Sequence, residues 1–224
     1  MRSIRCLVCL LALVAFPALA SAADRNGAQL ELAGLFGVPS GSYSSAGGAS
    51  LSDYFASGPG FSVTGTLGIT RRFHAGIRYG VFRGSKDAAA TFTDLAPAGS
   101  GVTGSGPFEA RRTLTTSEFS GVLQYRRAIR PSAQWYLEAG TGLLTFVEHV
   151  RISDHGAGLF AIAGYQQDPM WTAGAGFSRR VHKNVDLVIG GRWLQAFSSD
   201  GDVFASGDDP GFLEASVGLR YPNY

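Results

Sequence analysis

The 224-residue sequence has only two cysteines, Cys6 and Cys9, and only two lysines, Lys86 and Lys183. Both cysteines lie in the first apolar stretch, so the rest of the chain has no disulfide and no cysteine metal site. No later segment has the apolar length of a membrane helix, which needs about 20 residues. These absences exclude a disulfide-stapled scaffold, a cysteine-based zinc domain and a helical membrane protein.

The N-terminus has the order of segments that is typical of a secretory signal peptide. Arg2 and Arg5 give a positive start, the apolar run Cys6–Ala20 follows, and small residues come after it. This order predicts a signal peptide over residues 1–22, which is removed on export, and a single domain over residues 23–224.

Charge and composition narrow the class of the exported chain. Loss of Arg2 and Arg5 from the 19 basic residues leaves 17, against 17 acidic residues. A chain without a basic excess gives no support for a nucleic-acid partner. With 31 glycines and near-neutral mean hydropathy, the sequence fits a soluble β protein or a membrane β-barrel. The period of its apolar residues decides between them.

Eight segments alternate apolar and polar residues with a period of two, as strands with two unlike faces do. In the clearest of them, Phe61, Val63 and Leu67 alternate with Ser62 and Thr64. The predicted strands are Ala28–Gly37, Phe61–Thr70, Phe73–Arg83, Thr115–Tyr125, Trp135–Val147, Trp171–Arg179, Val185–Phe197 and Phe212–Tyr221.

The connections between these strands alternate in length. Three are short, and each carries an arginine pair: Arg71 and Arg72, Arg126 and Arg127, Arg179 and Arg180. The others are predicted as long loops, over residues 38–60, 84–114, 148–169 and 198–211. Within the third, the apolar run 157–165 is predicted to extend the strands beyond the bilayer. Short turns at one rim and long loops at the other are expected of an outer-membrane barrel.

The unlike faces favour a membrane barrel over a soluble one. One face carries nearly all the large residues, Trp135, Trp171 and Trp193 among them, and the other carries Gly, Ser, Thr and charges. Eight strands enclose too little space for so many aromatic rings. The prediction is therefore an all-β fold, an eight-stranded antiparallel up-and-down transmembrane β-barrel with its bulky residues facing lipid.

The polar face supplies charges that would meet inside a narrow lumen. They must form ion pairs or carry water there. We expect Arg–Glu contacts around Arg78 and Arg192 that block a wide channel. The predicted lumen charge network is Glu31, Arg78, Glu118, Glu138, Arg192 and Glu214.

The last predicted strand carries a resemblance to a known family. Leu213, Ala215, Val217, Leu219 and Tyr221 alternate within GFLEASVGLRY. This pattern resembles the final strand of the small outer-membrane barrels that include the opacity proteins and the OmpA-type transmembrane domain. The resemblance implies that the barrel-insertion machinery reads these five residues as an insertion signal.

The three arginine pairs are predicted to lie at the periplasmic rim and to contact anionic lipid headgroups. The other expected partners are lipopolysaccharide and a host or neighbouring-cell surface. Acidic loops could coordinate the divalent ions that bridge lipopolysaccharide, but ordinary solvated loops are favoured. A solvated turn is the plainer alternative for the arginines.

No catalytic, cofactor or metal site is predicted. The segment 148–155 gathers Glu148, His149, Ser153, Asp154 and His155, but its spacing matches no known motif, so a solvated loop is favoured. No histidine is followed two residues later by serine, the pair of outer-membrane lipid A deacylases.

The expected function is that of a non-enzymatic outer-membrane surface protein, structural or adhesive, with long extracellular loops. Two alternatives stay open: a narrow channel for small solutes, and an outer-membrane lipid-modifying enzyme. Because fold alone does not give function, this expectation depends on the family resemblance.

Overall fold

The computed structural model describes residues 27–44, 49–91, 107–154, 157–197 and 210–222. The predicted signal peptide lies outside these residues, as does most of the predicted loop 198–211. Nearly all described residues belong to strands, and no described helix is long and apolar enough to cross a membrane.

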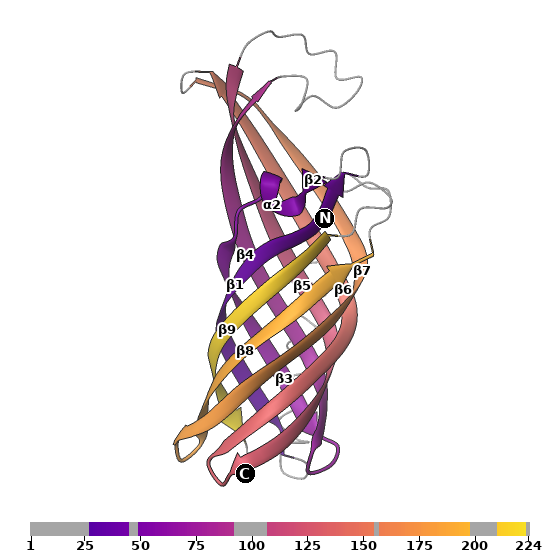
Figure 1. Ribbon diagram of the computed structural model, residues 1–224, viewed down its shortest axis with the longest axis vertical. Coiled ribbons are helices and arrows are strands. Elements are labelled where there is room, and N and C mark those ends of the chain that lie inside the picture. The colour runs from indigo at the N-terminus through magenta and orange to yellow at the C-terminus, as the bar shows by residue number, and fades with distance from the viewer. Residues whose placement is uncertain (1–26, 45–48, 92–106, 155–156, 198–209, 223–224) are drawn as a thin grey trace, which may run out of the picture.

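The fold is a closed barrel of eight antiparallel strands (Figure 1). Each barrel strand pairs with its neighbours in the sequence, and β1 pairs with β9 to close the sheet, from Gln29 opposite Pro222 to Gly41 opposite Pro210. The predicted fold class is therefore confirmed. The barrel strands are β1 (Gln29–Ser44), β3 (Gly58–Gly68), β4 (Phe73–Thr91), β5 (Pro107–Arg130), β6 (Ala133–Asp154), β7 (Ala157–His182), β8 (Val185–Ala196) and β9 (Pro210–Pro222).

The two halves of the barrel wall differ in height. Strands β4 to β7 have between 19 and 26 residues, whereas β3, β8 and β9 have between 11 and 13. The long strands therefore continue past the barrel mouth as a four-stranded antiparallel sheet (Figure 1). We call this part, residues 83–91, 107–114, 148–154 and 157–169, the β4–β7 extension.

Two predicted loops are consequently wrong in extent. Strands occupy 84–91 and 107–114 of the predicted loop 84–114, and they occupy nearly all of the predicted loop 148–169. The outward positions of the β4–β7 extension are polar, Ser85, Asp87 and Arg111 among them, so the apolar alternation stops before the strands do. The predicted strand extension over 157–165 is confirmed, because β7 begins at Ala157.

The predicted loop 38–60 is also partly structured. β1 runs on to Ser44, and a two-residue strand, β2 (Ala49–Ser50), pairs with it. One helical turn, α2 (Leu51–Tyr54), follows and lies at the barrel mouth (Figure 1).

The opposite rim is made of tight turns. At β3–β4, the backbone N–H of Ile69 donates to the carbonyl oxygen of Phe73 at 2.8 Å, and the Thr70 hydroxyl accepts from the Phe73 N–H at 3.0 Å. Only two residues separate β5 from β6, and two separate β7 from β8. Both ends of the barrel sheet, the start of β1 and the end of β9, lie at this rim.

Candidate functional site

The barrel interior is the candidate site because it gathers charged side chains from six strands. Each of them comes from an inward position of the alternating pattern and is nearly inaccessible to solvent. We call the group made by Glu31, Arg78, Glu118, Glu138, Arg192, Glu214 and Arg220 the ionic layer.

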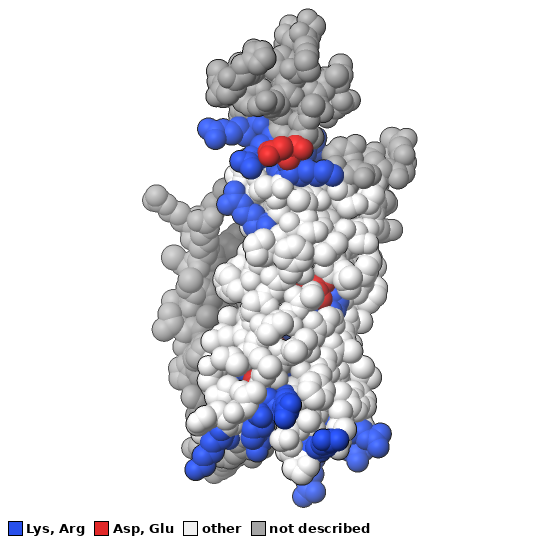
Figure 2. Space-filling view, turned by 60° about the vertical axis from the view of Figure 1, so that its left-hand side comes forward, with Lys and Arg blue, Asp and Glu red and all other residues white. Residues whose placement is uncertain are grey.

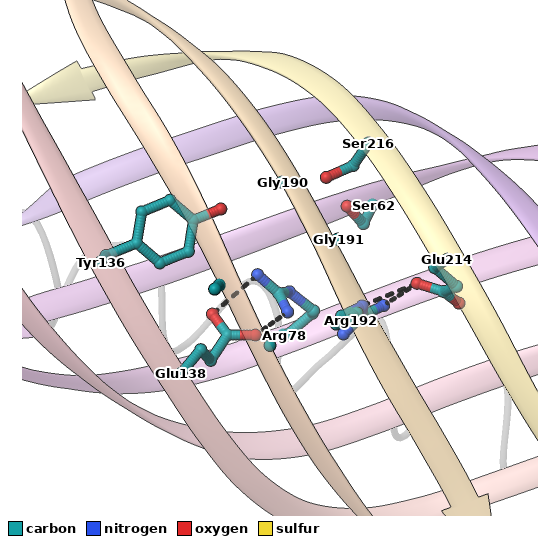
Figure 3. Close-up of a pocket in the computed structure, with 11 residues that line it drawn as sticks. Ser62, Arg78, Tyr136, Glu138, Gly190, Gly191, Arg192, Glu214 and Ser216 are labelled. Atoms are coloured by element: carbon teal, nitrogen blue, oxygen red, sulfur yellow. Dashed lines mark hydrogen bonds and ion pairs between the residues drawn. The ribbon is translucent and has the colours of Figure 1, made fainter.

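A bidentate ion pair joins β4 to β6 across the lumen. Arg78 donates two hydrogen bonds to the Glu138 carboxylate, one of them from Nη2 to Oε2 at 3.0 Å (Figure 3). Two neutral groups complete the pair: the Arg78 Nε–H donates to Thr64 Oγ1 at 2.8 Å, and Gln124 Nε2 donates to Glu138 Oε2 at 2.5 Å. The side chains of Arg78 and Glu138 are only 5% and 2% exposed. Such a pair is stable in a low-dielectric interior only while both partners are present.

A second cluster joins three strands around one arginine. Arg192 donates from Nη1 to Glu118 Oε1 at 2.9 Å. It also donates from Nε to Glu214 Oε2 at 2.6 Å (Figure 3). The Ser120 hydroxyl donates to Glu118 Oε1 at 2.6 Å. One guanidinium therefore neutralises part of the charge of two carboxylates, from β5 and β9, that would otherwise repel each other.

The third pair is at the seam where the barrel closes. Arg220 of β9 donates from Nη2 to Glu31 Oε2 of β1 at 2.7 Å. Its guanidinium carbon also lies 5.2 Å from the centre of the Tyr136 ring, within cation–π range. The structure thus brings all six residues of the predicted lumen network into ion pairs, and it adds Arg220. Arg220 has the same phase on β9 as Glu214, which is the signal that would have included it.

Arg126 differs from the other members of the three predicted rim pairs. It is 4% exposed and points into the barrel, where it donates from Nε to Gln124 Oε1 at 3.0 Å and from Nη2 to Thr66 at 3.2 Å. A third donation goes to Gln29. Its phase on β5 is that of Glu118, so the alternating pattern assigns it to the lumen and its neighbour Arg127 to the outer face.

The other predicted rim residues are exposed. Arg71 and Arg72 lie in the β3–β4 turn, and Arg127, Arg179 and Arg180 lie at the matching ends of β5 and β7. Figure 2 shows lysine and arginine gathered at this end of a mostly uncharged wall. Arg180 Nε lies 3.6 Å from the buried Asp186 carboxylate. The arrangement makes this rim strongly basic.

The five residues of the predicted insertion signal all face outward on β9. Leu213, Ala215, Val217, Leu219 and Tyr221 are each classed as exposed, at 51% for Leu213 and 43% for Tyr221. Glu214 and Arg220 occupy the inward positions between them. These five residues therefore lie on the outer surface of the barrel wall.

Sequence reasoning missed a second layer inside the barrel. At the mouth from which the β4–β7 extension rises, apolar side chains fill the lumen; the ring centres of Phe82 and Phe212 are 5.0 Å apart, and those of Phe146 and Phe212 are 6.0 Å apart. Leu51 of α2 and the following Phe55 are at most 1% exposed and close this cluster. We call it the apolar layer: Leu35, Leu51, Phe55, Phe82, Leu114, Leu144, Phe146, Met170, Leu194, Ala196 and Phe212.

Beside the apolar layer, on β6, lies a glutamate with a weaker partner. Glu148 Oε1 is 3.6 Å from Arg112 Nη1. Burial raises the pKa of the Glu148 carboxyl, and Arg112 offsets only part of this effect. Glu148 lies past Val147, where the apolar outer face of β6 ends.

The interior leaves little room for a solute. A pocket in the ionic layer, lined by Arg78, Tyr136, Glu138 and Arg192, has a volume of about 10 Å³ (Figure 3). That is space for about one water molecule. Across the described ranges, no three His, Asp or Glu side chains are grouped so that they would hold a metal ion.

Comparisons with known proteins bear on the fold. No protein-family model matches the chain, and no curated protein matches it by sequence. Among solved structures, a major outer membrane protein from Thermus thermophilus has a TM-score of 0.52 at 15% identity, over 87% of this chain and 99% of that one.

Two further solved structures are similar over comparable lengths. The outer membrane protease OmpT from Escherichia coli has a TM-score of 0.48 at 10% identity, over 88% of this chain and 96% of that one. The Neisserial surface protein NspA has a TM-score of 0.44 at 14% identity, over 87% and 96%. At these identities the likeness concerns the fold alone. The predicted resemblance to small outer-membrane β-barrels is confirmed at the level of the fold.

Proposed function

We propose that the chain is a non-conducting barrel of the outer membrane that presents the β4–β7 extension at the cell surface, in a structural or adhesive role. The observation that carries the proposal is the polarity of the wall. Below the apolar layer and the β4–β7 extension, the large side chains that face outward are apolar, and the side chains that face inward are small, hydroxylated or charged.

The outer face fits a bilayer. Large apolar side chains there are substantially exposed, among them Phe61 at 52%, Leu137 at 50% and Val217 at 56%. At about 3.4 Å per residue and a tilt near 40°, the outward run without charged residues spans roughly 20 Å on β4, from Phe73 to Val81. It spans roughly 30 Å on β6, from Trp135 to Val147, where Thr141 and Thr145 stand among the apolar residues. An outer-membrane barrel has an apolar band of about 25 Å. In water, a patch of this size would drive aggregation.

The inner face argues against a channel. Two different layers fill the lumen in succession: ion pairs in the middle, and apolar side chains with α2 at the wide mouth. An ion that entered the apolar layer would lose its hydration without gaining a partner, at a cost of several kcal/mol. The surface-protein hypothesis is therefore favoured over the narrow channel.

The β4–β7 extension supports the surface role. Strand β7 pairs with β8 only from Met170 onward, and β4 pairs with β3 only as far as Phe82. Beyond these residues, the extension stands above the barrel on one side (Figure 1). A tall sheet on a membrane anchor is suited to contact a host or neighbouring-cell surface.

The remaining partners follow from this placement. With the tight turns at the periplasmic side, the exposed rim arginines would meet anionic phospholipid, at about 1 kcal/mol each. The insertion machinery would meet the outward side chains of β9. Export through the periplasm would use the N-terminal segment.

Conductance tests the closed lumen. The purified barrel in a planar bilayer should give no steady single-channel current. Insertion is monitored in parallel by quenching of Trp135, Trp171 and Trp193 by brominated lipid. Strong quenching together with a steady current that changes on Arg192→Gln would favour the channel over the surface protein.

Attachment tests the surface role. Residues 87–111 are replaced by an Asn-Gly turn, because Lys86 and Arg112 are directly opposite each other and the turn closes the hairpin there. Cells that carry this variant should lose attachment to host cells or to each other, while the barrel still folds and inserts. The control replaces the solvent-facing residues of the β7–β8 turn. Equal attachment by both variants and the parent would remove the adhesive role and leave the structural one.

A further inference from the structure

A group of basic residues lies on the outer wall of β4, β5 and β6, just above the apolar band. Arg83, Arg111, His149 and Arg151 all face outward and are exposed. We call them the upper basic patch. Along the outward row of β4, only Val81 and Tyr79 lie between Arg83 and the middle of the apolar band. The patch therefore begins at the level where the band ends.

The charges of the patch are not balanced. Asp87, Arg111 and Arg151 are directly opposite one another on the three strands. Arg111 Nε lies 3.0 Å from Asp87 Oδ1, so this one carboxylate pairs with Arg111. Among the residues whose side chains the structure describes, Arg83 and Arg151 have no acidic partner. Like charges on directly opposed residues destabilise a strand pair, so the Arg111–Arg151 pairing carries an electrostatic cost that a bound anion would reduce.

The surface between these arginines is rich in hydroxyl groups. The exposed Ser85 stands between the row of Arg83 and the row of Arg111, and its Oγ lies 3.0 Å from Oγ1 of the buried Thr113. Thr115 is directly opposite Arg83. Guanidinium groups bind phosphate through two parallel hydrogen bonds, and hydroxyls suit sugar.

The rest of the wall has no such group. In the described parts of β1, β3, β8 and β9, every outward position is uncharged, including Phe36 and Leu213 near the same mouth. Among the described residues, the upper basic patch is therefore confined to β4, β5 and β6 and is not part of a ring of charges around the mouth.

We propose that the upper basic patch binds the phosphate groups of a lipopolysaccharide molecule in the outer leaflet and holds it against β4–β6. This inference rests on the proposed membrane placement. The acyl chains of the lipid would lie on the band beside Tyr79, Phe119 and Leu143, and its phosphorylated sugars would lie on the arginines and hydroxyls above. The contact is direct, without the bridging divalent ions that acidic loops would need.

Binding of purified rough lipopolysaccharide to the folded, detergent-solubilised barrel tests this proposal, with native mass spectrometry as the readout. The variant Arg83→Gln/Arg111→Gln/Arg151→Gln should bind at least 10-fold more weakly than the parent. The matched control Arg71→Gln/Arg72→Gln/Arg179→Gln removes three exposed arginines from the opposite rim and should bind as the parent does. The parent and the patch variant should bind dephosphorylated lipopolysaccharide with equal affinity.

Three results would overturn the proposal: equal binding by the patch variant and the parent, equal loss in the rim control, or tighter binding of a lipid-free sulfated oligosaccharide than of lipopolysaccharide at the patch. Tryptophan quenching by brominated lipid separates this failure from failure of the membrane placement. If brominated lipid quenches the tryptophans but the patch variant binds lipopolysaccharide as the parent does, the proposed function stands and only this site is wrong. If the triple variant does not fold, Arg83→Gln and Arg151→Gln singly should each weaken binding.

Discussion

The ionic layer and the apolar layer fill the same lumen by opposite chemistry. On β9 they meet at Glu214 and Phe212, which are successive inward residues, and on β8 they meet at Arg192 and Leu194. Ion pairs are specific in geometry but expensive to bury, whereas apolar packing is tolerant in geometry but needs volume. The change from one to the other occurs at the mouth where the extension begins.

This difference indicates what surrounds each part of the wall. In the band, small and charged inward residues leave the large residues for the lipid-facing side. Near the mouth, α2 can fold inward and bring Leu51 and Phe55 to an interior that is already apolar. The two layers should therefore respond differently to the loss of one side chain, and the following variants measure that difference.

The largest effect is expected for Arg192→Met. It leaves Glu118 and Glu214 buried without their common cation, which should cost about 3–5 kcal/mol of unfolding free energy. Reversible urea unfolding in lipid vesicles measures it. The triple variant Glu118→Gln/Arg192→Met/Glu214→Gln should recover most of the loss. If the single variant is as stable as the parent, the ionic layer does not stabilise the barrel.

Next comes Phe212→Ala, which removes the ring that contacts both Phe82 and Phe146. Truncation of a fully buried phenylalanine costs about 3 kcal/mol or somewhat more. Phe212→Leu keeps most of the volume and should cost less than half as much. A loss for Phe212→Leu equal to that for Phe212→Ala would show that the layer needs the ring itself, against the tolerance argued above.

A smaller effect is expected at Gly176, which leaves space for the Tyr136 ring inside the barrel. A Cβ on Gly176 would lie 2.4 Å from the Tyr136 ring, and one on Gly190 would lie 2.5 Å from the Tyr136 hydroxyl. Gly176→Ala should cost about 1–3 kcal/mol through this overlap. Gly121, whose nearest neighbour would be a carbonyl oxygen at 3.9 Å, is the control, and Gly121→Ala should be nearly neutral. Equal losses at the two sites would contradict the role of Tyr136.

The smallest effect is expected for Glu148→Gln. Because burial raises the pKa of this carboxyl, its charged form is already disfavoured in the folded protein. A carboxyl whose pKa is raised by folding makes the protein less stable as the pH rises. Because the charge of Glu148 is already disfavoured, Glu148→Gln should change the unfolding free energy by less than about 1 kcal/mol at neutral pH. Its effect should be smaller still at acid pH. Glu138→Gln, in the bidentate pair with Arg78, is the contrasting variant and should be clearly destabilised at neutral pH.

The alternation of residues was sufficient to predict the eight strands and the lumen charges, because lipid forces one face of every strand to be apolar. Glu31, Arg78 and Arg192 stand out as the charged residues within otherwise regular patterns. The same reasoning identifies Arg126 and Arg220 as inward once their phase is followed to the strand ends.

The rest could not be read from the pattern. In the β4–β7 extension the outward positions are polar, Ser85 and Arg111 among them, so no apolar outer row marks the strands. Phe82, Phe146 and Phe212 are large apolar residues at positions where the alternating pattern predicts inward, polar side chains. Their role depends on contacts between strands that are distant in the sequence. Leu51 and Phe55 lie in a connection, where no period exists.

The orientation of the wall is tested most directly by single spin labels on cysteines placed along it. Labels at Leu137, Phe177 and Val217 should be highly accessible to oxygen and poorly accessible to a water-soluble nickel chelate, as lipid-facing sites are. Labels at Ser62, Thr64 and Ser120 should be shielded from lipid. Nickel-chelate access at the first three positions, with lipid contact at the last three, would contradict the account.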